Sequence, residues 1–237
     1  MITLGIDTSN KTMGISLYQD QNLMAEYVST NKKNHSVTLM PAIDFLMQEN
    51  QLKPSDIDEI LVASGPGSYT GLRIAVTTAK TLAWTLKADL YSLSSLAIIA
   101  AGAPQQFCGL IVPLINARRD NVYTGIYQWQ NGEMRVVKPD GHLSIYELFT
   151  QLKEQNDEIL FIGEDVPVFE SMIATEMPQA NYIADSILPR TMQLVKNIGE
   201  KVSSIDEFTP QYLKLVEAEE NWLKTHKSEG KSYVERV

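Results

Sequence analysis

The chain has 237 residues, of which 44% are hydrophobic and 21% charged, a composition typical of a globular protein rather than a disordered or fibrous one. Its formal net charge of −9 argues against a broad phosphate-binding surface, because affinity for nucleic acid depends mainly on Lys and Arg. Cys108 is the only cysteine, so no internal disulfide can form; its apolar neighbours predict burial, and a reducing compartment is indicated. The N-terminus lacks the basic region of a signal peptide and no apolar run approaches about 18 residues, so we expect a cytoplasmic protein without a membrane span.

The first half of the chain begins with three strand-like runs and continues with helix, strand and helix. Residues 2–6 are almost entirely apolar, as expected for a strand that is covered on both faces. Two further strands, 13–18 and 23–29, should be joined by a turn at residues 20–22. A helix is expected from Ser36 to Gln48, with a kink or a late start at Pro41. A buried strand at 60–64, a glycine-rich loop and a helix ending near Leu86 complete this half.

The second half repeats this order with little sequence identity. The pattern predicts strands at 110–115, 122–127, 134–138 and 159–163, and helices at 145–155 and 166–175. A last long helix should start near Pro189, because proline is favoured in the first turn. Two successive βββαβα units predict an α/β protein with a duplicated fold. The break falls in the stretch 100–104, which gives an N-terminal lobe (1–102), a C-terminal lobe (103–216) and a charged tail (217–237).

Two loops of the first half carry residues that suit a nucleotide. Asp7, Thr8 and Ser9 directly follow the first strand, where a carboxylate can hold Mg²⁺ and hydroxyls can contact a phosphate. In the run 65–71, glycines permit close approach to a ligand, and the following helix N-terminus favours an anion. Both loops have a simpler interpretation. The first is ordinary turn chemistry, and the second is a tight turn with Ser68 or Thr70 as helix cap.

Residues for catalysis are otherwise missing from the sequence. His35, His142 and His226 lie far apart and lack metal-binding spacing. Ser68 lies in Gly-Ser-Tyr-Thr-Gly rather than in the Gly-x-Ser-x-Gly of a nucleophile elbow. The run 65–71 also lacks the Gly-Lys-Ser/Thr ending of a P-loop. We therefore expect neither a metal site nor a catalytic residue in this chain.

The two helices of the first half carry more apolar and small residues than a single core face needs. Ala75, Ala79 and Ala83 recur every four residues and form a smooth ridge on which another helix could pack. On the helix before them, Val37 and Phe45 fall off the main apolar stripe. An extra apolar face indicates a partner surface, whereas the alternative is that both helices only cover their own sheet.

These segments together resemble the bacterial TsaB (YeaZ) family. The most specific match is the run 65–74, Gly-Pro-Gly-Ser-Tyr-Thr-Gly-Leu-Arg-Ile. Weaker matches in the same order extend the resemblance over residues 2–214, at 6–9, 35–41, 116–127, 189 and 210–214. The chain departs from the family where Asn116 replaces a common Asp and Lys214 a common Arg. Both changes argue against a phosphate site in the second lobe.

The resemblance implies an actin/Hsp70/sugar-kinase-like (ASKHA) fold and a role in forming N6-threonylcarbamoyladenosine (t6A) at position 37 of tRNAs that read ANN codons. It implies a non-catalytic subunit that pairs with the catalytic subunit TsaD and with the ATPase TsaE. The acidic net charge predicts that this chain contacts tRNA only indirectly, and the extra apolar helix faces predict self-association when it is alone. No cofactor is expected to bind this chain tightly, and ATP or ADP at the interface with the partners is left open. The expected partner-binding residues are His35, Leu39, Met40, Ile43, Met47, Ala75, Ala79 and Ala83. A vestigial nucleotide site would comprise Asp7, Thr8, Ser9, Gly65, Gly67, Ser68 and Thr70.

Two other functions compete with that of a partner subunit. A nucleotide-dependent ATPase or kinase of the same superfamily would use Asp7 and the run 65–71. A peptidase would need a nucleophile with a base, or a metal, and the sequence shows the pattern of neither.

Overall fold

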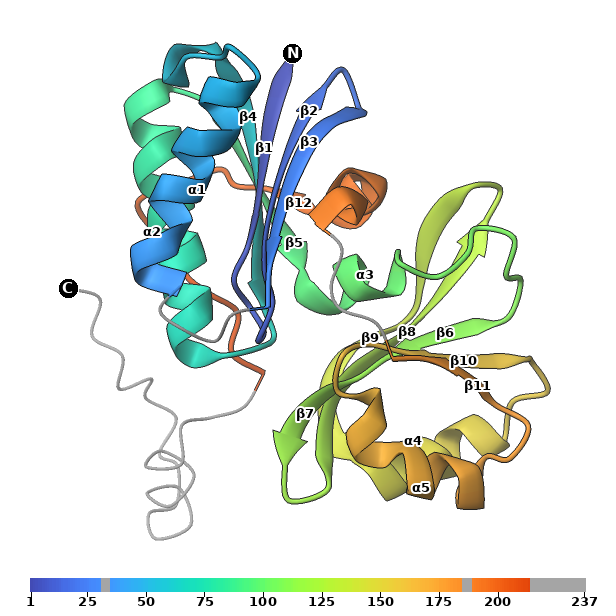
Figure 1. Cartoon of the computed structure of the whole chain (residues 1–237). Helices are drawn as coiled ribbons and strands as arrows, with labels where there is room; N and C mark the ends of the chain where they lie inside the picture. Colours follow the sequence, from blue (N-terminus) through green and yellow to red (C-terminus); the bar gives the residue numbers. More distant parts are fainter. Residues whose placement is uncertain (31–34, 185–188, 214–237) are drawn as a thin grey trace, which may run out of the picture.

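The computed structural model describes residues 1–30, 35–184 and 189–213, which form two lobes that each contain one β-sheet (Figure 1). Helices α1 (His35–Glu49) and α2 (Tyr69–Leu86) cover the outer face of the first sheet. Helices α4 (Ile145–Lys153) and α5 (Val166–Glu176) cover the outer face of the second. The inner faces of both sheets are turned towards helix α3 (Ser95–Ala100) and the 3-10 helix η2 (Pro189–Ile198). Along the described part of the chain no helix is long and apolar enough to cross a membrane.

The first sheet has the strand order β12-β5-β4-β1-β2-β3. Strands β1 (Ile2–Asp7), β2 (Met13–Gln19) and β3 (Asn22–Ser29) form an antiparallel meander, and β4 (Ile57–Gly65) and β5 (Asp89–Ser94) extend it in parallel on the other side of β1. A short 3-10 helix, η1 (Pro54–Asp56), precedes β4. Helix α1 begins at His35 and continues through Pro41, so the late start expected there is wrong.

The second sheet repeats this topology. Strands β6 (Leu110–Pro113), β8 (Asn121–Gln130) and β9 (Glu133–Ser144) take the places of β1, β2 and β3, while β10 (Ile159–Ile162) and β11 (Asn181–Ile183) take those of β4 and β5. The expected strand at 110–115 divides, because a separate strand β7 (Ile115–Arg118) pairs with the start of β8. Two lobes with the same order of strands and helices confirm the duplicated ASKHA-type fold.

The C-terminal segment does not stay with the second lobe. Strand β12 (Glu200–Lys201) pairs with β5 of the first sheet, and Lys80 of α2 donates hydrogen bonds to the backbone carbonyls of Asp206 and Phe208. Residues 200–213 therefore lie on the first lobe, whereas the sequence placed 103–216 together in the second. The long helix expected from Pro189 is the 3-10 helix η2, and the tail 217–237 lies outside the described residues.

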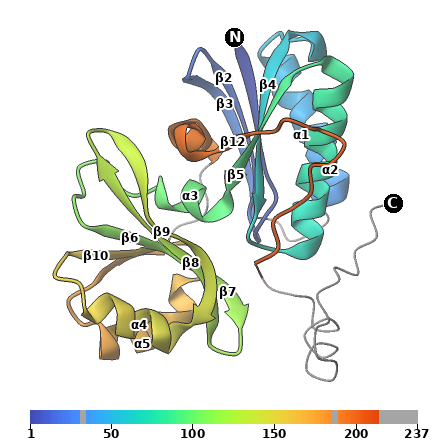
Figure 2. The same ribbon diagram turned by 180° about the vertical axis from the view of Figure 1, so that it is seen from behind.

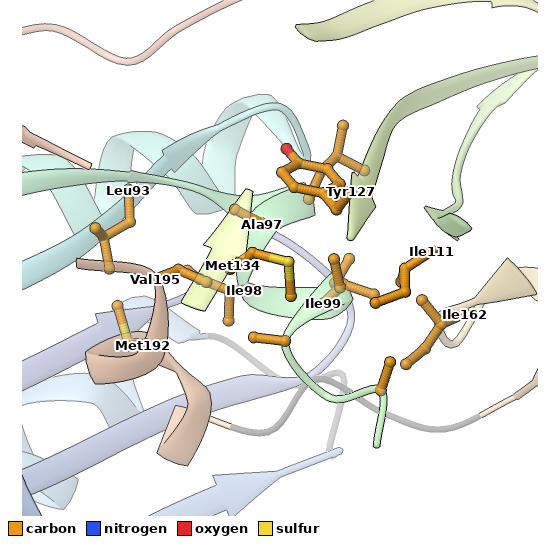
Figure 3. Close-up of a cluster of buried hydrophobic side chains, with 14 of the residues drawn as sticks. Leu93, Ala97, Ile98, Ile99, Ile111, Tyr127, Met134, Ile162, Met192 and Val195 are labelled. Atoms are coloured by element: carbon orange, nitrogen blue, oxygen red, sulfur yellow. The ribbon is translucent and has the colours of Figure 1, made fainter. Parts of the chain in front are cut away.

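One hydrophobic cluster joins the two lobes. Figure 2 shows α3 in the space between the two sheets. The cluster combines Leu93 of β5 and the buried helix α3 with Tyr127 and Ile162 of the second lobe (Figure 3). Met192 and Val195 of η2 fill the space between them and are fully buried. Each lobe also has a core of its own under its outer helices. Since the shared cluster is as buried as either lobe core, the lobes are held in one fixed relation. Cys108, expected in a core, is exposed instead.

Candidate functional site

The structure brings the two predicted loops of the first lobe into direct contact. Both loops follow central strands, β1 and β4, which are parallel neighbours, so their carboxyl ends meet at one edge of the sheet. The backbone N–H of Ser68 donates to the carbonyl of Ser9 at 2.6 Å, and the hydroxyl of Thr8 donates to the carbonyl of Gly71 at 2.6 Å. The hydroxyl of Ser68 accepts from the N–H of Gly71 at 3.3 Å as the N-cap of α2. The loops therefore use much of their hydrogen-bonding capacity on each other.

The glycines in the run 65–71 are required by contacts within the chain. A Cβ atom on Gly67 would lie 2.3 Å from the carbonyl oxygen of Ser9, and one on Gly71 would lie 2.0 Å from that of Thr8. Gly65 has φ +139°, and a Cβ there would lie 2.3 Å from the carbonyl oxygen of Gln211. Close approach of backbone to backbone thus accounts for these glycines without a ligand.

Asp7 lies fully buried beneath these loops. One carboxyl oxygen accepts a hydrogen bond from the N–H of Ser9 at 2.8 Å, and within the described residues the other oxygen has no hydrogen-bond partner. Burial raises the pKa of Asp7 to about 6, while the hydrogen bonds from Ser9 act in the opposite direction. Its carboxylate is therefore costly to ionise and is not aimed at the solvent.

The second lobe meets the same loops with two more carboxylates. Glu164 and Asp165 follow β10, at the position that the run 65–71 occupies in the first lobe. Glu164 accepts from the backbone N–H of Lys11 at 3.0 Å and from the hydroxyl of Thr12 at 2.9 Å. Asp165 accepts from Lys11 Nζ at 2.5 Å and from the N–H of Asn116 at 2.9 Å. These contacts connect the loop that follows β1 in the first lobe with the loop that follows β10 in the second.

A cleft of about 640 Å³ remains between the lobes above this junction. Its walls come from residues 9–11 and 67–70 of the first lobe and from 115–118, Tyr123 and Asp165 of the second. Lys11, which lines it, is already paired with Asp165, and Arg118 lines the opposite wall. The cleft thus holds Ser9, Gly67, Ser68 and Thr70 of the predicted site, but Asp7, Thr8 and Gly65 do not line it. Among the described residues no cluster of His, Cys, Asp and Glu could hold a metal ion.

The partner surface predicted on α1 and α2 needs correction. Six of its residues are buried against the first sheet, because they form the core-facing stripe of each helix: Leu39, Ile43, Met47, Ala75, Ala79 and Ala83. The alanine ridge is small because α2 packs closely on the strand beneath it, and it offers nothing to a partner. Met40 remains exposed, and His35 is half-buried with its ring 3.3 Å from the carbonyl of Asn10.

Four large apolar side chains face solvent on these helices, and Met40 is the one that belongs to the predicted set. Val37, Met40 and Phe45 of α1 are 64%, 47% and 54% exposed, and Trp84 of α2 is 71% exposed. We call these four residues the apolar face. Val37 and Phe45 could be recognised in the sequence as apolar residues outside the main stripe, and Trp84 follows by the same reasoning. An open groove of about 530 Å³ lies at the N-terminal ends of α1 and α2, and one of its lining residues, Ser36, directly precedes Val37.

Comparison with known proteins yields consistent relatives. A family model for TsaD, described as tRNA N6-adenosine threonylcarbamoyltransferase, matches residues 22–225. The chain is 41% identical to the tRNA threonylcarbamoyladenosine biosynthesis protein TsaB of Bacillus subtilis, over 96% of this chain and 100% of that protein. It is 27% identical to TsaB of Escherichia coli over 59% of this chain and 64% of that protein.

Solved structures agree with these sequence relatives. A Pseudomonas aeruginosa protein described as similar to the peptidase YeaZ has a TM-score of 0.76 and 27% identity, covering 90% of this chain and 99% of its own. YeaZ from the same organism has a TM-score of 0.74 and 25% identity with the same coverage.

Proposed function

The chain belongs to the TsaB family, and from that premise we propose that it acts as a non-catalytic subunit that binds and activates the threonylcarbamoyltransferase TsaD. The chain takes part in the biosynthesis of threonylcarbamoyladenosine in tRNA. The observation that carries the proposed role is the apolar face on α1 and α2, four large apolar side chains on neighbouring helices in an otherwise acidic protein. Exposed apolar side chains of this size are typical of a protein–protein contact.

The contacts in the cleft support a subunit rather than an enzyme. The loops that would hold a phosphate bind each other, and the counterpart loop of the second lobe contributes Glu164 and Asp165. A nucleotide phosphate would meet the carboxylate of Asp165 in this cleft, and Lys11 is already paired with that carboxylate, which leaves Arg118 as the other cation among the lining residues. An ATPase of this fold would also need its lobes to move, and here both the shared cluster and the Lys11–Asp165 pair oppose such motion.

Several finer assignments belong to the same proposal. TsaE would act on the assembled pair, the modified tRNAs would be those that read ANN codons, and a more basic subunit would contact the tRNA because this chain carries a net charge of −9. The single cysteine suits a cytoplasmic location. ATP or ADP, where it takes part, would bind at an interface with the partners.

The experiment is the modification of tRNA in vitro by TsaD and TsaE, with threonylcarbamoyl-adenylate as the donor of the threonylcarbamoyl group, in the presence and absence of this chain. We expect modification only when the chain is present. The double variant Met40→Asp/Trp84→Asp should lose at least about tenfold in TsaD affinity, because charge replaces the apolar contact, while its Tm stays unchanged. Val168→Asp is the matched control, since Val168 is 54% exposed on α5 of the other lobe. Equal modification with and without the chain would refute the proposed role.

A further inference from the structure

One cation lines the groove at the N-terminal ends of α1 and α2 and contacts two tyrosine side chains. Arg73 projects from α2 into the groove between α1 and α2, whose other lining residues are Ser36, Tyr69, Thr70, Ile74, Thr77 and Thr78. Its guanidinium carbon is 4.5 Å from the centre of the Tyr69 ring, one helical turn earlier. The groove is open to solvent and rich in hydroxyl groups, so it is a polar extension of the apolar face.

A residue far along the chain completes the support of Arg73. Tyr212 stacks on Tyr69 with ring centres 5.1 Å apart, and the Nε of Arg73 donates to the hydroxyl of Tyr212 at 3.4 Å. Tyr212 is placed there by Gln211, whose N–H donates to the carbonyl of Ser64 at 2.8 Å. Two tyrosines from separate segments therefore restrict the arginine, which remains exposed and lines the groove.

No acidic group of the described chain neutralises this arginine. The groups that perturb the pKa of Arg73 are Tyr212 and Tyr69, and both raise it. Helix α2 carries no Asp or Glu at all, and Asp44 on α1 accepts a hydrogen bond from Gln48 instead. In a protein with nine more acidic than basic charges, an exposed arginine without a carboxylate partner is available to one from another molecule.

We propose that Arg73, held by Tyr69 and Tyr212, binds a carboxylate side chain of the catalytic partner and thereby makes the helix face selective for that partner. This inference rests on the proposed function, because it assumes that the apolar face is where the partner binds. A planar guanidinium pairs with a carboxylate through two parallel hydrogen bonds, and its fixed position reduces the entropy lost on binding. The apolar face supplies contact area. A partner without a matching carboxylate would leave Arg73 unpaired, and such a complex would be less stable.

The test measures the affinity of TsaD for the full chain by calorimetry, with the wild type, Arg73→Glu and Arg73→Lys. We expect Arg73→Glu to weaken binding at least thirtyfold and Arg73→Lys about tenfold, since lysine keeps the charge but lacks the fork. Arg135→Glu is the matched control, because Arg135 is an exposed arginine of the second lobe; it should change the affinity by less than twofold. Thermal unfolding of every variant should match the wild type, since Arg73 is exposed.

Tyr212 is expected to affect TsaD binding only by positioning Arg73. A double-mutant cycle distinguishes this role from a general contribution of Tyr212 to the structure. Tyr212→Ala should weaken TsaD binding in the wild type but have no further effect on an Arg73→Ala background. If the wild type binds TsaD and Arg73→Glu binds equally well, the inference fails while the proposed function stands. If the wild type does not bind TsaD at all, the proposed function fails first. If Arg73→Glu abolishes self-association and leaves TsaD binding intact, the carboxylate belongs to a second copy of this chain, which overturns the inference.

Discussion

At the scale of single residues, Asp7 combines a position typical of a nucleotide site with complete burial. Its carboxyl group is fully buried, one oxygen has no partner among the described residues, and its pKa lies near 6 instead of the ordinary 3.8. Between these two pH values the folded protein keeps a proton that the unfolded chain has released. The free energy of unfolding therefore falls as the pH rises from about 4 to about 6, and it stays lower above that range by roughly 2–3 kcal/mol.

The variant Asp7→Asn tests this linkage. Asparagine cannot ionise and retains an oxygen that can accept from the N–H of Ser9, so we expect the variant to be more stable than the wild type at pH 7.5, by up to about 2 kcal/mol. At pH 4.5 the folded wild type still holds the Asp7 proton while the unfolded chain has largely released it, so the gain should shrink to about a third of its value at pH 7.5. Urea unfolding at both pH values measures the difference. A gain of the same size at pH 4.5 and 7.5 would show that ionisation of Asp7 is not its cause.

Gly71 gives a second residue-scale prediction. Gly71→Ala should lower the free energy of unfolding by about 1–3 kcal/mol, because the new Cβ would meet the backbone oxygen of Thr8, which cannot move without breaking the contact between the loops. Gly141→Ala is the control, since nothing lies within 4 Å of a Cβ there, and it should change stability by less than about 0.5 kcal/mol. Denaturant unfolding of both variants decides the matter. Equal stability of the two would mean that the loop yields to the extra methyl group.

The same residues mark the limit of sequence interpretation. The sequence identified Asp7 and the run 65–71 as a connected feature, and the structure confirms that these loops are neighbours. The sequence alone does not distinguish a glycine that lets a ligand approach the backbone from one that lets another loop approach it, because both positions require a residue without a Cβ atom. Nor could it place Gln211 against Gly65, since that contact joins segments 146 positions apart and depends on the return of the C-terminal segment to the first lobe.

At the scale of secondary-structure elements, the pattern located most helices and strands but misjudged one face on each of the helices α1 and α2. The core stripe of α1 and the alanine ridge of α2 follow helical periodicity, and periodicity cannot distinguish a ridge that packs on a sheet from one that awaits a partner. The strand β5 and helix α3 were missed because they follow each other directly, and Ser94, where they meet, was not recognised as the N-cap of α3.

Substitutions on α2 separate its two faces. Ala79→Arg should lower the free energy of unfolding by more than about 4 kcal/mol, because Ala79 is fully buried and the charge would have no partner there. Thr81→Arg, on the exposed side of the same helix, should stay within about 0.5 kcal/mol of the wild type. Thermal unfolding followed by circular dichroism measures both. A folded Ala79→Arg protein with normal Tm would restore the alanine ridge as a candidate partner surface.

At the scale of the whole molecule, the shared hydrophobic cluster makes two lobes behave as one body. Residues 189–213 leave the second lobe, pass between the sheets as η2 and end on α2 of the first. A duplicated fold read from sequence suggests two units that fold separately, and no local pattern reveals that the last segment crosses back. A fixed relation between the lobes suits a subunit that presents a constant surface to its partner.

Met192 tests this coupling because it lies on η2 and is fully buried among side chains of both lobes. Calorimetry of the wild type should show one unfolding transition whose calorimetric and van't Hoff enthalpies agree. Met192→Ala should lower the stability of that single transition by about 2–5 kcal/mol, through the cavity left in the shared cluster. Leu194→Ala, whose side chain is 41% exposed on the same 3-10 helix, is the control and should lower the stability much less.

Hydrogen exchange should show amides of β1 and β4 losing protection together with those of β6 and β10. Two resolved transitions, of which only one shifts in Met192→Ala, would instead mean that the lobes unfold separately and that η2 is attached to only one of them.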